Sequence, residues 1–170
     1  MVEKGNLYRM KKFRGEYEVK VDGKNRIQLP VALRKQYEDL GDVKFILARG
    51  RKNSLIFCPE PVWEEVENKV SVLDADDSMI EEYSLLTVGG SDFANIDSNG
   101  RLLLPPTLKR HAKIKEDVII AALGDKFIIR DAVLYNEFFD NMTLDREREL
   151  TTYASMVRQK AREIESAQKG

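Results

Sequence analysis

The sequence of 170 residues contains a single cysteine, Cys58, and a single histidine, His111. One cysteine cannot form an internal disulfide, and a Cys/His zinc site needs several ligands of these two types. Cys58 lies in an apolar run and is interpreted as a buried core thiol. His111 follows two basic residues and is interpreted as a surface residue rather than a ligand or a base. We therefore expect no metal site.

The chain also lacks a long apolar run, because no stretch approaches the ~20 residues that cross a bilayer. Its N-terminus is polar and has no apolar core of the signal-peptide type. We therefore expect a cytoplasmic protein with no membrane partner. The sequence has no Gly-rich phosphate loop, no metal-ligand cluster and no nucleophile with a candidate base. We accordingly expect no enzyme, no cofactor and no small-molecule substrate.

Charge of one sign is not in excess, since the formal net charge is -1. Nucleic-acid binding thus has no support from the total charge and must rest on where the charges lie. Apolar residues make up 42% of the chain, which is enough for a core and too much for a disordered protein. Residues 1–12 form a basic N-terminal arm, for which phosphate contact and simple terminal disorder are both open.

What the chain does contain is an internal duplication. The first copy has Gly15, Asp22, Arg26, Pro30 and Leu33. The second copy repeats these residue types at one constant offset, as Gly90, Asp97, Arg101, Pro105 and Leu108. Such self-similarity indicates two copies of one structural unit. We assign 13–73 to the first repeat, 74–89 to a connecting helix, 90–142 to the second repeat and 143–170 to a C-terminal helix.

Each copy is expected to form a strand, a tight turn, a second strand, a short helix, two more strands and a longer helix. In the first copy the strands are predicted at 16–21, 26–29, 43–48 and 54–58. The short helix has Leu33, Tyr37 and Leu40 on one face, and Gly41 ends it. The first two strands of the second copy are predicted at 92–96 and 101–104.

Two helices follow in the second half. Asp131 is predicted to cap a helix with an apolar stripe, which we assign to the core, made of Leu134, Tyr135, Phe138, Phe139 and Met142. From Leu144 to Gln168 the chain is predicted to be one charged helix with a narrow apolar stripe. Such a stripe needs a neighbour, either the body of the same chain or another subunit.

The chemically suggestive feature is the Asp-x-x-x-Arg turn of each copy. Asp22 and Asp97 can accept hydrogen bonds from the amides of their own turns. Asn25 and Gly100 tolerate the left-handed backbone of a tight hairpin. Each turn then leads directly into an arginine, whose guanidinium matches a phosphate or a guanine edge. A plain surface ion pair worth ~0–1 kcal/mol is the alternative, but occurrence in both copies disfavours it.

These turns, together with Phe13-Arg14-Gly15-Glu16-Tyr17 and the Leu-Pro and Pro-Pro-x-Leu segments, resemble the MraZ family of the AbrB/SpoVT superfamily. The resemblance covers most of the chain, from about Phe13 to Met142. It implies an α+β fold with a mainly β core. That fold is a double-ψ, swapped-hairpin AbrB-like β-barrel of two internal repeats, with flanking helices and a C-terminal helix.

The resemblance also implies a function. Members of the family form ring-shaped homo-oligomers and bind tandem repeats in double-stranded DNA, including the promoter of the division and cell-wall gene cluster that begins with their own gene. This chain would then be a sequence-specific transcriptional regulator in the cytoplasm, associated with the nucleoid. A second hypothesis is an oligomeric ring that binds a protein or an effector without specific DNA binding, which the net charge and the acidic helix at 60–67 favour.

Carried over residue by residue, the resemblance makes Arg26 and Arg101 the main DNA contacts. The residues beside them are Lys24, Asn25 and Asn99, and those that position the turns are Asp22, Asp97 and Gly100. The first turn departs from the family pattern, which more often has Gly immediately before the Arg. The second turn carries less positive charge than the first.

Overall fold

The computed structural model describes residues 12–73 and 76–168. The chain divides into two compact units, the first ending at Tyr135 and the second beginning at Asn136. The basic N-terminal arm lies outside the described residues except for Lys12.

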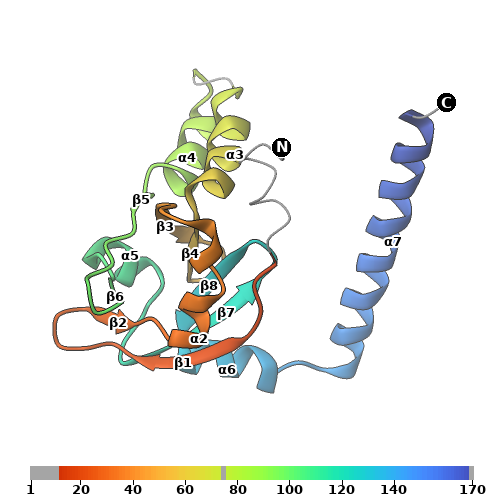
Figure 1. Cartoon of the computed structure of the whole chain (residues 1–170). Helices are drawn as coiled ribbons and strands as arrows, with labels where there is room; N and C mark the ends of the chain where they lie inside the picture. Colours follow the sequence, from red (N-terminus) through yellow and green to blue (C-terminus); the bar gives the residue numbers. More distant parts are fainter. Residues whose placement is uncertain (1–11, 74–75, 169–170) are drawn as a thin grey trace. The chain divides into compact units, whose positions relative to one another are not determined.

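The first unit is built on two antiparallel sheets (Figure 1). The larger has the strand order β1-β7-β8-β4-β3-β5, and the smaller pairs β2 with β6. The bounds of the larger sheet's strands are β1 Glu16–Lys20, β3 Phe45–Gly50, β4 Ser54–Pro59, β5 Asp92–Phe93, β7 Asp117–Leu123 and β8 Lys126–Asp131. The smaller sheet, called the ribbon below, consists of β2 (Arg26–Gln28) and β6 (Arg101–Leu103).

The two repeats exchange their first strands. β1 of the first copy pairs with β7 of the second, with Tyr17 opposite Ile120. β5 is the counterpart of β1, and it pairs with β3 of the first copy, with Ile46 opposite Phe93. Interchanging the copies simply reverses the strand order of the large sheet, as a two-fold relation between them requires. The expected mainly β fold of two interlocked repeats is thus confirmed.

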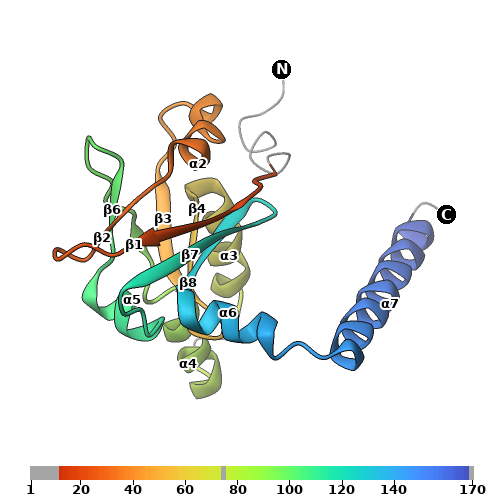
Figure 2. The same ribbon diagram turned by 90° about the horizontal axis from the view of Figure 1, so that it is seen from below.

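One hydrophobic core lies between the ribbon and the large sheet. Ile27 and Leu102, which face each other in the ribbon, are fully buried with Phe57 and Phe127 of the large sheet. Phe127 also stacks on Phe13, with 4.5 Å between the ring centroids. Burying each such side chain contributes ~1.5–3 kcal/mol, so the ribbon is held firmly on the body. In Figure 2 the connections into β2 and β6 both project from the same side of the unit.

The helices of the first unit flank these sheets. Their bounds are α2 Val31–Lys35, η1 Glu38–Leu40, α3 Glu60–Ser71, α4 Ser78–Thr87, α5 Pro106–His111 and α6 Ala132–Asp140, which continues into the second unit. The single helix predicted through Leu33, Tyr37 and Leu40 is wrong, because the chain forms α2 and then the separate 3-10 turn η1. Tyr37 interrupts the helix with a φ of -117°, although Leu33 and Leu40 are both buried as expected.

Three other expectations concern single side chains. Asp131 caps α6 as predicted, since its Oδ1 accepts from the amides of Val133 at 3.1 Å and Leu134 at 3.3 Å. Cys58 is buried as predicted, and burial raises its pKa to about 12. His111 is half-buried, so its predicted surface position is wrong. Its Nε2 lies 2.9 Å from the carbonyl oxygen of Gly50.

The apolar stripe of α6, which the sequence assigns to the core, is partly exposed. Phe138 is 38% exposed and Phe139 is 53% exposed. The pattern indicated an apolar face correctly, but periodicity alone does not show whether that face is covered within one chain.

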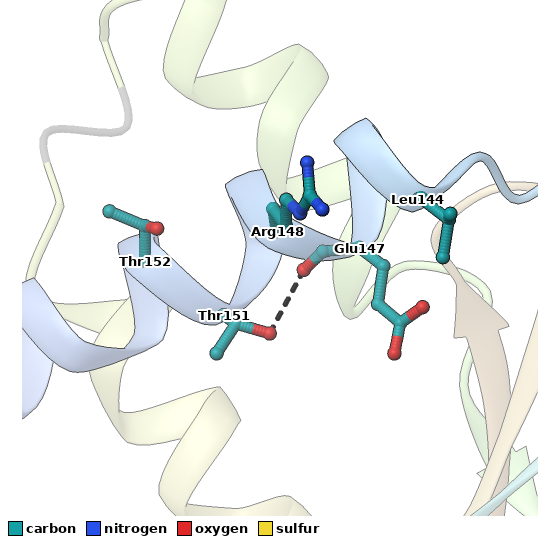
Figure 3. A pocket seen from close by; sticks show the side chains of 5 residues that line it. All are labelled: Leu144, Glu147, Arg148, Thr151 and Thr152. Carbon is teal, nitrogen blue, oxygen red and sulfur yellow. Dashed lines mark hydrogen bonds between the residues drawn. The ribbon is translucent and has the colours of Figure 1, made fainter.

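The second unit contains the helix α7 (Leu144–Gln168), with the bounds predicted from the sequence. None of its side chains is buried, and its exposed stripe includes Leu150, Tyr153, Val157 and Ile164. Figure 3 shows a hollow along its first turns, where the Thr151 hydroxyl donates to the main-chain oxygen of Glu147 at 2.9 Å. Among the described helices, α7 included, none has the length and apolar character to cross a membrane.

Candidate nucleic-acid interface

The first candidate turn, Asp22 to Arg26, is closed by the carboxylate that begins it. Asp22 Oδ1 accepts from the backbone amide of Lys24 at 2.8 Å and from that of Arg26 at 2.9 Å. Asn25 takes a φ of 57°, the left-handed conformation expected from the sequence. Because side chain and backbone both close the loop, the position of Arg26 at its end is well determined.

The second turn, Asp97 to Arg101, repeats this geometry. Asp97 Oδ1 accepts from the backbone amides of Asn99 at 2.9 Å and of Arg101 at 3.0 Å. Gly100 takes the left-handed φ of 75° at the position equivalent to Asn25. The two unequal sequences therefore form the same loop, and the departure of the first turn from the family pattern does not change its hydrogen bonding.

The ribbon brings the two turns together. Gln28 lies opposite Arg101 in the strand pairing, and its side-chain amide donates to the main-chain oxygen of Asn99 at 2.9 Å. The amide of Leu29 donates to the main-chain oxygen of Gly100 at 3.0 Å. The amide of Leu104 donates to the main-chain oxygen of Asn25 at 2.8 Å. Each turn is thus hydrogen-bonded to the outgoing strand of the other repeat, and they behave as one surface.

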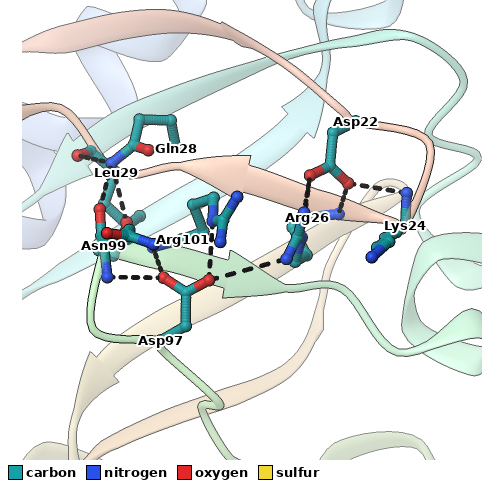
Figure 4. Close-up of polar contacts among 9 residues, drawn as sticks. Asp22, Lys24, Arg26, Gln28, Leu29, Asp97, Asn99 and Arg101 are labelled. Atoms are coloured by element: carbon teal, nitrogen blue, oxygen red, sulfur yellow. Dashed lines mark hydrogen bonds and ion pairs between the residues drawn. The ribbon is translucent and has the colours of Figure 1, made fainter.

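Both arginines are held by carboxylates of this surface (Figure 4). Arg26 contacts Asp22 Oδ2 through Nε at 2.9 Å and Nη2 at 2.8 Å. Arg101 contacts Asp97 Oδ2 through Nε at 2.7 Å, and Nη1 of Arg26 lies 3.8 Å from the same oxygen. Asp97 therefore lies between the two guanidinium groups and links the turns.

The charges of these carboxylates are stabilised by their donors. The side-chain hydrogen bond from Arg26 is the main cause that lowers the pKa of Asp22 to about 2. The backbone hydrogen bond from Arg101 is the largest cause that lowers the pKa of Asp97. Both groups stay ionised near neutral pH, so they offset the two arginine charges and orient the guanidinium groups rather than leave them mobile.

The arginines keep hydrogen-bonding capacity toward solvent. Their side chains are 24% exposed at Arg26 and 34% exposed at Arg101. Asp97 engages Arg101 through Nε, which leaves the two terminal nitrogens outside that contact. A guanidinium fixed at one edge with donors at the other suits a phosphate or a guanine edge.

The other sequence-predicted residues take different positions. Lys24 and Asn99 are exposed at the tips of their turns, where a large ligand could reach them. Asn25 is half-buried and its side-chain oxygen accepts from Nζ of Lys109 at 2.8 Å, so this amide is committed within the protein. Gly100 is buried under the guanidinium of Arg34.

The chain is similar to known proteins over most of its length. The family model described as "MraZ protein, putative antitoxin-like" matches residues 12–82 and 87–155. The chain belongs to the MraZ family. Each matched segment contains one Asp-x-x-x-Arg turn, so the MraZ family pattern coincides with the duplication.

Three curated relatives illustrate the similarity, and each is named Transcriptional regulator MraZ. The Leuconostoc citreum protein is 34% identical over 117 residues, which cover 69% of this chain and 79% of that protein. The Carboxydothermus hydrogenoformans protein is 31% identical over 126 residues, covering 74% and 85%. The Marinobacter nauticus protein is 26% identical over 140 residues, covering 81% and 93%.

The turns of this MraZ-family chain have two further basic neighbours, Arg34 and Lys109, for which the turn motif itself predicts no role. Lys109 of α5 bonds Asn25, and the Arg34 guanidinium of α2 lies where a Cβ on Gly100 would be 3.0 Å from its Cζ. Each cation thus contacts the turn of the opposite repeat. The available signal was that these two basic residues occupy equivalent positions after Leu33 and Leu108.

The site offers cations and amides rather than metal ligands. Within residues 12–73 and 76–168, no group of three or more His, Cys, Asp or Glu side chains is placed to hold a metal ion. The two aspartates are engaged by backbone amides and guanidinium groups. The chemistry that the arrangement supports is therefore the binding of an anionic, hydrogen-bonding partner.

Proposed function

We propose that this chain is a sequence-specific, DNA-binding transcriptional regulator whose two Asp-x-x-x-Arg turns contact tandem repeats in promoter DNA. The observation that carries the proposal is the joint display of Arg26 and Arg101 on one ribbon, with Asp97 between them. The name of the curated relatives, Transcriptional regulator MraZ, supports the regulatory role. By the family resemblance, the targets include the promoter of the division and cell-wall cluster that contains its own gene, and the protein works at the nucleoid in the cytoplasm.

In this proposal the two kinds of cation have different tasks. Arg26 and Arg101 are oriented by Asp22 and Asp97, so they lose little further freedom when their outer nitrogens engage a base edge. A good bidentate contact of this kind discriminates against a wrong base by ~1–3 kcal/mol. Lys24, exposed at the tip of its turn, contributes phosphate contact, which adds salt-sensitive affinity without sequence preference.

One chain presents only two such arginines, which is a small surface for specific recognition. We propose that a ring-shaped homo-oligomer repeats this surface and that tandem DNA repeats match it. Once one protomer is bound, the contacts of its neighbours become intramolecular, and avidity raises the affinity by ~10²–10⁴. The exposed apolar stripes of α6 and α7 are compatible with contacts between subunits.

The test is fluorescence anisotropy or a gel shift with a duplex of tandem promoter repeats. Arg101→Ala and Arg26→Ala should each weaken binding by about 5- to 150-fold, the equivalent of ~1–3 kcal/mol per contact. Arg146→Ala is the matched control, because Arg146 also forms an exposed ion pair, with Glu149 at 2.8 Å, but lies on α7 outside the turns. Undiminished binding by both turn variants would overturn the proposal.

A cleft of about 500 Å³ favours the second candidate, an effector- or protein-binding ring. Trp63 and Val66 of α3 and Tyr83 and Leu86 of α4 are among its lining residues. Arg49 of β3 and Arg51 of the β3–β4 turn also line it. Trp63 is the only tryptophan of the chain, so its fluorescence reports on this cleft. If that candidate is correct, an effector will quench Trp63 and the protein will not distinguish promoter repeats from unrelated duplex.

A further inference from the structure

The end of α5 carries a group of cations beside the first turn. An open depression of the surface is lined by Asn25, Pro106 and Ile114 together with four basic residues, Lys109, Arg110, Lys113 and Lys115. We call these four residues the α5 basic cluster. Its lysines and arginine belong to one short segment, so their charges add over a small area in a protein whose net charge is -1.

The α5 basic cluster is attached to the first turn at both of its ends. Nζ of Lys109 donates to Oδ1 of Asn25 at 2.8 Å. At the other end, the main-chain oxygen of Glu116 accepts from the amide of Val21 at 2.7 Å, immediately before Asp22. The cluster therefore lies next to the first turn. A ligand as large as a DNA duplex that contacts Lys24 or Arg26 would also reach the cluster.

Lys113 occupies a position that is unfavourable for a lysine. It follows the C-cap Ala112 of α5 and takes a left-handed φ of 54°. Glycine is the usual residue at this point of a helix end, because it adopts positive φ without steric cost. Lysine at this position therefore makes the fold less stable than glycine would, and it places a positive charge next to the turn.

The corresponding positions around the second turn carry less positive charge. Arg34 and Lys35 stand where the second repeat has Lys109 and Arg110, so the charge is the same at these two positions. The positions that follow differ. The first repeat places Glu38 where the second has Lys113, and Asp39 where the second has Ile114. Lys115 corresponds to the buried Leu40. The hydrogen bonding of the two turns is the same in both repeats, but the electrostatic surroundings are not.

We propose that the α5 basic cluster is a phosphate-binding extension of the first turn, which contacts the DNA backbone on one side only and so fixes the orientation of each protomer on its repeat. This inference rests on the proposed function. Glu116, which follows the cluster, is the nearest acid in sequence and reduces but does not cancel its four positive charges. Phosphate contacts position a protein on DNA without reading its sequence.

The first experiment measures the salt dependence of binding to tandem-repeat and scrambled duplexes by fluorescence anisotropy. The double variant Lys113→Gln and Lys115→Gln should reduce the slope of log K against log salt by about 1.8, because each phosphate that is no longer neutralised changes the slope by ~0.9. Affinity should fall by the same factor for both duplexes. The control is Lys69→Gln with Lys160→Gln, which removes the same charge from exposed positions of α3 and α7.

Lys113→Gly separates binding from folding. Because glycine prefers the left-handed conformation observed here, this variant should have a Tm at or above that of the unmodified protein. It should nevertheless bind DNA more weakly and with a smaller salt slope. An unchanged slope in this variant and in the double variant, while Arg101→Ala still weakens binding to the tandem repeats, would overturn the cluster's role and leave the proposed function intact. Failure of the unmodified protein to bind DNA would overturn both.

Orientation has its own readout. Cys58 is the only cysteine and is 1% exposed, so Glu116→Cys, at an exposed position next to the cluster, introduces a thiol that a DNA-cleaving reagent can label selectively while all four cations are kept. On tandem-repeat DNA the labelled protein should cut on one side of each repeat. Cuts of equal intensity on both sides would contradict oriented binding.

Discussion

At the scale of single residues, the two aspartates are the centre of the proposed interface although neither is expected to contact DNA. Each accepts two backbone hydrogen bonds within its turn and one or two from the guanidinium it orients. The arginines could therefore be assigned to a fixed position from the sequence, because this bonding is local. The cross-repeat contacts of Arg34 and Lys109 could not, since a local pattern contains no information on the opposite repeat.

Gly100 permits one of these contacts. We expect Gly100→Ala to lower the free energy of unfolding by ~1–2 kcal/mol for the left-handed backbone alone. Displacement of Arg34, whose Cζ lies 3.0 Å from the added Cβ, adds to this cost. Thermal unfolding should show a Tm lower by several degrees. Gly23→Ala is the control, because no atom lies within 4 Å of its Cβ position and it should change stability by less than ~0.5 kcal/mol. Equal stability of the two variants would contradict the assignment.

The low pKa of Asp22 predicts a contribution of the first turn to acid stability. A carboxyl group whose folded pKa is about 2, against an ordinary value of 3.8, stabilises the folded state above pH 4. That contribution is lost as the pH falls from about 4 to about 2. Tm measured over this range should fall more steeply for the unmodified protein than for Asp22→Asn. Asp145→Asn, on the exposed α7, should behave as the unmodified protein; parallel curves for all three would refute the prediction.

At the scale of secondary-structure elements, the sequence pattern located the strands well and their lengths less well. The strand predicted at 92–96 is reduced to β5, Asp92–Phe93, with an isolated bridge at Ile96. Here the chain bends from the large sheet toward the ribbon, and the pairing partner changes from β3 to β6. Alternation along one segment does not reveal such a change of partner.

The sequence pattern identified the apolar faces of helices more reliably than it predicted whether these faces are buried. In α3, Trp63 and Val70 are buried, whereas α4 and α7 have no buried side chain among their described residues. Helices with an apolar face therefore differ in how far that face is buried, because burial depends on neighbours that lie elsewhere in the chain or in another subunit. The exposed faces of α4, α6 and α7 are where we expect contacts between protomers.

At the scale of the whole molecule, the duplication indicated two related halves, and the structure shows how these halves are joined. The exchange of β1 and β5 ties the repeats into one sheet, and the ribbon places one turn of each repeat side by side. Self-comparison alone could not distinguish interlocked halves from two beads on a chain; the family resemblance supplied that expectation. The unequal charges around the turns were visible in the sequence. The hydrogen bond from Lys109 to Asn25, which joins the α5 basic cluster to the first turn, was not.

The proposed function depends above all on an oligomer that displays this pair of turns repeatedly to tandem DNA repeats. The decisive quantity is the ratio of affinities for duplexes of equal length that contain two repeats or one, measured by fluorescence anisotropy at one salt concentration. We predict binding to the two-repeat duplex at least ~10²-fold tighter, from the effective concentration of the second contact. A ratio near the statistical factor of about 2 would show independent, single-chain binding and would contradict the repeated display.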